Sequence, residues 1–175
     1  MEVEAKHEVL FKSLTKFYED DATFETFRAV LGGSTKMSLR VLDWLVTNYA
    51  KKRNIVYGIK DNDRDVAFNM FLEYKSQLKA YSKRYFDPFC RRGRVMHRGV
   101  ETTCGQLNFF RWAIKYGVLD YALRHHDEIE QDMLSSIQHR YSVGTKKEDS
   151  KRKELSKAAI KSCTTTMVKV KVKFS

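Results

Sequence analysis

A segment near the middle of the chain combines many positive charges with aromatic rings. Between Lys75 and Arg98, eight side chains are Lys or Arg and one, Asp87, is acidic. Tyr81 and Tyr85 lie within the same segment. Guanidinium and ammonium groups neutralise phosphates, and aromatic faces stack on bases. The composition therefore predicts a surface that binds a polyanion, above all a nucleic acid, either DNA or RNA.

Two kinds of contact are expected from this segment. The basic side chains would hold phosphates, while Tyr81 and Tyr85, which flank Lys83 and Arg84, would stack on bases or sugars. The other aromatic residues nearby are expected in the core or as loop anchors. The predicted nucleic-acid-binding residues are Lys75, Lys79, Tyr81, Lys83, Arg84, Tyr85, Arg91, Arg92, Arg94 and Arg98.

The net charge of +11 is concentrated in two blocks of the 175-residue chain. Residues 75–98 and 146–175 each carry a net charge of +7, whereas residues 1–74 and 99–145 carry −1 and −2. A solvated cationic face that only favours solubility is the alternative interpretation. It is weaker, because one acid among nine charged residues leaves few internal salt-bridge partners for the first block.

The sequence offers little support for catalysis or for a metal site. It has no G-x-S-x-G elbow, no phosphate-binding G-x-x-x-x-G-K-[ST] loop and no compact acid pair at a spacing typical of a metal nuclease. The possible zinc ligands are Cys90, His97, Cys104 and His125 or His126, but neither a C-x-x-C nor an H-x₃₋₅-H pair is present. We expect no enzyme, cofactor or metal. A nucleic-acid-processing enzyme or its accessory subunit is a remaining alternative.

Bulk composition indicates a single folded domain. A hydrophobic content of 42% with eleven Phe and nine Tyr is enough for a core. The first residues are polar and acidic, and no apolar stretch approaches the length of a membrane span. Three widely spaced cysteines make a disulfide framework improbable. We expect an intracellular, soluble protein without a transmembrane segment.

Apolar spacing predicts three helices in the first third of the chain. The first runs from about Ala5 to Tyr18, and the second is capped by Asp21 and ends at Gly32-Gly33. The third is capped by Ser38 or Ser34 and ends at the basic run 51–53. The β-branched and aromatic residues at 54–59 then predict a short strand.

A longer helix is expected to carry the start of the basic segment. It begins at Asp63 or Asp65, with nearby acids as N-terminal caps, and stops near Tyr85 because Pro88 disfavours helical geometry at Asp87. The four-residue spacing would align the ammonium groups of Lys75, Lys79 and Lys83 in one row.

The next part of the chain predicts a short strand at 94–100 and two further helices. Thr103 and Gln106 form a capping-box pattern that opens a helix ending at Gly117. The following helix, from about Leu119 to Arg140, is acidic, and it would be repelled from the DNA major groove. We therefore do not interpret this pair as a DNA-binding helix-turn-helix.

We expect a mainly α fold, a single compact helical domain of five or six helices over 1–143 with a minor β element. A basic linker over 144–163 and a short C-terminal strand over 164–175 follow. In that strand Val and Phe alternate with Lys, giving one apolar and one cationic face. It would pair with the segment near Ile55 or Val95, or mediate self-association or binding to a protein partner.

Four stretches of the chain resemble a known family: MSLRVLDWLVTNYAKK, FLEYKSQLKAYSKRYFDPFCRR, ETTCGQLNFFRWAIKYGVLDY and KRKELSKAAIKS. They are similar to an uncharacterised basic protein that recurs among nucleocytoplasmic large DNA viruses. The resemblance implies the host-cell cytoplasm (the virus factory), the nucleus or the virion as the location, and implies no catalytic residue.

Together these patterns favour a non-enzymatic viral nucleic-acid-binding protein. It would use the Lys/Arg/Tyr surface at 75–98 and the basic tail to hold the phosphate backbone. The alternative is a virion structural or assembly protein, whose basic blocks and C-terminal strand bind protein or membrane partners.

Overall fold

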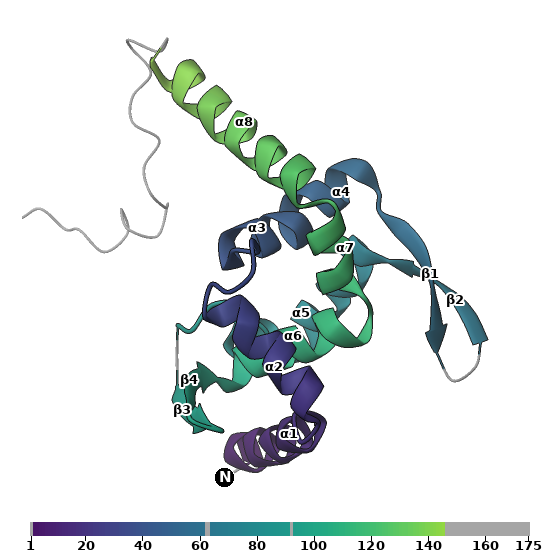
Figure 1. The fold of residues 1–175 in the computed structure, drawn as a ribbon, viewed down its shortest axis with the longest axis vertical. Helices are drawn as coiled ribbons and strands as arrows, with labels where there is room; N and C mark the ends of the chain where they lie inside the picture. The colour runs from purple at the N-terminus through teal and green to yellow at the C-terminus, as the bar shows by residue number, and fades with distance from the viewer. Residues whose placement is uncertain (1, 62–63, 92, 146–175) are drawn as a thin grey trace, which may run out of the picture. The chain divides into compact units, whose positions relative to one another are not determined.

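The computed structural model describes residues 2–61, 64–91 and 93–145, and the side chains of 8–60, 64–91 and 93–139. The chain is mainly helical with two small two-stranded antiparallel sheets, which confirms the predicted fold class (Figure 1). It divides into two compact units after Ile137.

The first two helices are α1 (Glu2–Phe17) and α2 (Asp21–Leu31). Leu14 and Phe27 bury their side chains completely, as the apolar spacing predicts. The prediction that Asp21 caps α2 is wrong by one residue. The carboxylate of Asp20 accepts the hydrogen bond from the Thr23 amide at 2.8 Å, which leaves Asp21 available for another contact.

A continuous helical stretch follows, made of α3 (Leu39–Trp44), the π-helical turn η1 (Leu45–Tyr49) and α4 (Ala50–Arg53). Ser38 caps it by accepting a hydrogen bond from the amide of Val41, which decides between the two predicted caps. The stretch ends where Asn54 adopts a left-handed conformation. The expected inward residues are all buried: Val41, Leu42, Leu45, Val46 and Tyr49.

The segment after α4 forms a hairpin of β1 (Val56–Asp61) and β2 (Arg64–Asn69). The strand expected at 54–59 is confirmed, but the helix expected to begin at Asp63 or Asp65 is wrong. Asp65 lies opposite Lys60 in the ladder, so it is a strand residue and not a helix cap. The physical reason is packing, because the hairpin lets Phe68 bury its ring against Trp112.

The helix that carries the basic segment is α5 (Met70–Tyr85), and Asn69 caps it. Its backbone is interrupted at Ser82, where φ is 56° and ψ is 170°. The expected row of three lysines is therefore wrong. Lys75 and Lys79 share a helical face, but Lys83 lies beyond the break.

After α5 the chain forms the hairpin β3 (Arg94–His97) and β4 (Val100–Thr103), then α6 (Cys104–Lys115). The single strand expected over 94–100 is thus two strands joined by a tight turn at Arg98-Gly99, where both residues have positive φ. Thr103 caps α6 as predicted, accepting a hydrogen bond from the Gln106 amide at 3.0 Å.

The first turns of α6 hold the chain segment that follows α5. The side-chain amides of Asn108 and Gln106 donate to the carbonyls of Tyr85 and Pro88, both at 2.8 Å, and the Asp87 amide donates to the Gly105 carbonyl at 3.2 Å. The backbones approach so closely that a Cβ on Gly105 would lie 3.0 Å from the Arg84 carbonyl oxygen. The buried ring of Phe86 then packs on the rings of this helix.

The chain continues as α7 (Val118–Arg124) and α8 (His126–Thr145). The single helix expected over 119–140 is therefore broken at His125. Acidic side chains at the start of α8 bind residues of η1 and the helices on either side of it. Asp132 accepts hydrogen bonds from Trp44 and Lys52, and Glu128 accepts one from the Tyr49 hydroxyl.

The C-terminal basic block, 146–175, lies outside the described residues. The expected linker 144–163 begins inside α8, which continues to Thr145. The rest of the linker and the expected strand 164–175 stay predictions. Within the part of the chain that the structure describes, no helix is both long enough and apolar enough to cross a membrane.

We expect Gly105→Ala to destabilise the protein by about 1–3 kcal/mol, because the added methyl group would displace backbone atoms at the end of α5. Urea unfolding followed by circular dichroism measures the loss. Gly58→Ala is the matched control, since a Cβ there meets nothing within 4 Å. Equal stabilities of the two variants would contradict the close approach.

Candidate nucleic-acid interface

Lys75 and Lys79 lie on one exposed face of α5. With Leu72, Ser76 and Leu78 they line a shallow depression of about 590 Å³. Neither ammonium group forms an ion pair with a carboxylate among the described residues. Their charge is therefore available to an anionic partner.

A lysine from the neighbouring helix adds to this face. The Nζ of Lys51, at the start of α4, lies 5.8 Å from the centre of the Phe71 ring. Phe71 precedes Lys75 by one helical turn, so Lys51 lies over a ring that is one turn from Lys75 on α5. No carboxylate in the described part of the chain pairs with Lys51. We call Lys51, Lys75 and Lys79 the lysine surface.

Sequence reasoning missed Lys51 as a site residue. The run 51–53 was interpreted only as the solvent-exposed end of a helix. A detectable signal existed, since three consecutive basic residues precede a strand and lie just before the basic segment in the chain. Their proximity to α5 depends on the β1–β2 hairpin, which returns the chain to α4.

The two basic residues beyond the break in α5 are placed differently. Lys83 and Arg91 act on the carboxyl of Asp43: burial raises the pKa of that carboxyl, and the two cations partly offset this. The guanidinium of Arg84 lies 5.3 Å from the centre of the Tyr85 ring. Arg84 therefore lies against a tyrosine, whereas Lys83 is exposed and forms no ion pair among the described residues.

The arginines of the following loop and hairpin have carboxylate partners. Arg91 pairs with Asp87 at 3.6 Å and lies over the Phe89 ring, while Arg94 pairs with Glu101 at 2.8 Å across the β3–β4 hairpin. Arg92 lies outside the described residues, so its predicted role stays a prediction.

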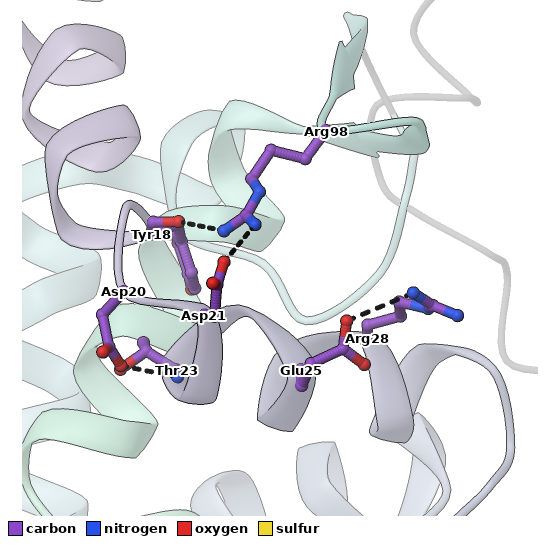
Figure 2. A network of polar contacts seen from close by, with 7 residues as sticks. All are labelled: Tyr18, Asp20, Asp21, Thr23, Glu25, Arg28 and Arg98. Carbon is purple, nitrogen blue, oxygen red and sulfur yellow. Dashed lines mark hydrogen bonds and ion pairs between the residues drawn. The ribbon is translucent and has the colours of Figure 1, made fainter.

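Arg98 connects the β3–β4 hairpin to the first two helices. Figure 2 shows its guanidinium reaching both the backbone carbonyl of Tyr18, at 2.9 Å, and the carboxylate of Asp21. The same group lies 4.4 Å from the centre of the Phe24 ring. These contacts give Arg98 a structural role. They leave few N–H donors of its guanidinium group to bind a phosphate.

The residue before Arg98 is buried in aromatic surroundings. His97 is 6% exposed, and its ring packs edge-on against Phe11, Tyr18 and Phe24. Burial, followed by the positive charge of Arg98, lowers the pKa of His97. A neutral imidazole here is a core group that supports the Arg98 contact and is shielded from ligands.

The two tyrosines predicted to stack on bases are only partly exposed. Tyr81 and Tyr85 both pack against the hydrophobic core. Asn108 holds the backbone of Tyr85, and Arg84 lies over its ring. Tyr74 and Phe86 are buried, as expected.

The possible zinc ligands do not come together. Within the described residues, no three His, Cys, Asp or Glu side chains form a group that could hold a metal ion. Cys104 is buried, and burial raises the pKa of its thiol to about 11, which disfavours the thiolate that zinc requires. Cys90 is partly exposed and lines a separate depression beside Leu39 and Gln106.

A family model matches residues 3–161, which is most of the chain. The chain belongs to the family of unknown function designated DUF7197. Among curated proteins it is similar to Uncharacterized protein L507 of Acanthamoeba polyphaga mimivirus, a nucleocytoplasmic large DNA virus. The two are 39% identical over 152 residues, which cover 81% of this chain.

The viral relative is the longer protein, since the matched region spans 58% of its length. The match confirms the expected relationship to proteins of large DNA viruses. No solved structure is significantly similar to the chain.

Arg98→Ala should destabilise the protein by about 1–2 kcal/mol, because it removes two hydrogen bonds and a cation–π contact that join three elements. Arg94→Ala, the matched control, removes an exposed ion pair and should cost about 0.5 kcal/mol or less. Thermal unfolding compares them. If both variants lost equal stability, Arg98 would not be the structural arginine of this hairpin.

Proposed function

We propose that this protein is a non-enzymatic nucleic-acid-binding protein of a large DNA virus, and that the lysine surface holds the phosphate backbone. The observation that carries the proposal is that the lysines of that surface lack carboxylate partners. Lys51, Lys75 and Lys79 come from two adjacent helices and have no carboxylate partner among the described residues, whereas Arg91, Arg94 and Arg98 each have one. Ammonium groups without a carboxylate partner attract phosphates.

The basic C-terminal block is proposed to strengthen this binding. Residues 146–175 carry a net charge of +7, which adds nonspecific attraction to the same ligand. Binding of this kind needs no cofactor. The proposed locations are those in which viral nucleic acid is present: the virus factory in the host cytoplasm, the nucleus or the virion.

One observation favours the second candidate function, a virion structural or assembly protein. Leu72 is 61% exposed and lines the same depression as Lys75 and Lys79. An exposed leucine beside lysines suits an acidic protein surface, and a phosphate backbone gains little from it. Charge substitutions and a substitution of Leu72 therefore separate the two candidates.

We expect the double variant Lys75→Gln/Lys79→Gln to bind nucleic acid more weakly and with less salt dependence. Each lysine that neutralises a phosphate contributes about 0.9 to the slope of log K against log salt, so the slope should become shallower by about 1.8. Fluorescence anisotropy of a labelled duplex, titrated at several salt concentrations with the full chain, measures the slope.

Two control variants make this test specific. Lys12→Gln/Lys16→Gln removes two exposed lysines with the same four-residue spacing from α1 and should leave the slope nearly unchanged. Leu72→Gln should also bind normally. Equal losses in the two lysine variants would show that net charge alone governs binding, and a loss on Leu72→Gln would show that Leu72 also contributes to holding the duplex, against a purely ionic contact.

A further inference from the structure

The aromatic rings in the described part of the chain are buried or only partly exposed. Across the side chains that the structure describes, every Phe, Tyr and Trp is buried or half-buried, and the large apolar residues that are mostly exposed are all aliphatic or Met. On α5, Tyr81 and Tyr85 pack against the core. Next to the lysine surface, Phe71 is also packed against the core, and Lys51 lies over its ring.

Binding of a single strand depends on such rings. Proteins that bind single-stranded DNA or RNA combine a cationic groove with exposed aromatic side chains, on which successive unpaired bases stack. A duplex differs, because its bases are stacked on one another and its outer surface is phosphate and sugar. A surface with lysines that lack carboxylate partners, and with neighbouring rings packed against the core, suits the duplex.

The kind of cation on this surface also bears on recognition. Base edges are read chiefly by Arg, Asn and Gln, whose planar fork or amide matches them, and at guanine also by Lys; elsewhere lysine acts as a point charge on a flexible stem. Lys75 and Lys79 are separated by about 6 Å along the helix axis, since they are four residues apart. The forks nearest in sequence, those of Arg53 and Arg84, lie over the rings of Tyr49 and Tyr85. Those of Arg94 and Arg98 are engaged by Glu101 and Asp21.

We infer that the ligand of the lysine surface is double-stranded nucleic acid, held by its phosphate backbone without reading of the base sequence. The inference rests on the proposed function and adds to it the class of nucleic acid. Lys51, Lys75 and Lys79 contact phosphates on the outside of the duplex, and Tyr81 and Tyr85 remain packed against the core of the protein.

Duplex melting tests this inference directly. The full chain is added at low salt to a short mixed-sequence duplex that melts below the unfolding temperature of the protein. A protein that prefers the duplex raises its melting temperature, and one that prefers single strands lowers it. We expect an increase that is smaller with Lys75→Gln/Lys79→Gln and is retained with Lys12→Gln/Lys16→Gln.

The possible outcomes separate the two claims. A lowered melting temperature, or tighter binding of either isolated strand than of the duplex, would overturn the inference while leaving nucleic-acid binding intact. No binding to either form at low salt would overturn the proposed function, and the inference with it. Two duplexes of unrelated sequence should bind equally, and a preference of about tenfold or more for one of them would contradict backbone recognition.

Discussion

The attachment of residues 85–88 to the start of α6 determines where the positive charges of the chain are placed. Two side-chain amides of α6 hold the carbonyls of Tyr85 and Pro88, and the Gly105 backbone packs directly on the end of α5. These bonds satisfy backbone groups that would otherwise be buried without partners, which is costly. They also direct the ring of Phe86 into the core.

This attachment divides the basic segment into two parts with different environments. Before it, Lys75 and Lys79 project from a helix and form no ion pair with a carboxylate in the described part of the chain. After it, Arg91, Arg94 and Arg98 lie beside carboxylates supplied by the loop, the hairpin and α2. The arginines thus contribute to the fold, and the lysines remain available for the proposed ligand. From the composition of 75–98 alone, the lysines and arginines cannot be told apart. Their contacts in the structure separate them.

Local signals predicted much of the fold. Pro88 ended the α5 helix near the expected residue, and the Thr103 cap and the buried spacing of 41–49 were confirmed because each depends on neighbours within a turn or two. The hairpin at 64–69 was missed, since Asp63 and Asp65 resemble helix caps and the strand is stabilised by distant rings such as Trp112. The break at Ser82 has no evident sequence signal.

The sequence predicts which segment of the chain carries the candidate site, but not which of its residues are available to a ligand. The lysines of α5 follow from the helical repeat, whereas the partners of the arginines and the burial of the tyrosines depend on contacts from residues far along the chain. The Asn108 contact that holds the Tyr85 backbone comes from α6, and the Asp21 partner of Arg98 comes from α2. Such pairings are determined by tertiary packing, which one sequence does not reveal.

The most direct test of the account is lysine footprinting with the full chain. Exposed amines are acetylated with and without duplex DNA at low salt, and modification at each lysine is read by mass spectrometry. The account predicts that duplex protects Lys51, Lys75 and Lys79, while the exposed lysines of α1, Lys12 and Lys16, react equally in both samples. Unchanged reactivity of Lys75 and Lys79 in the presence of bound duplex would contradict it.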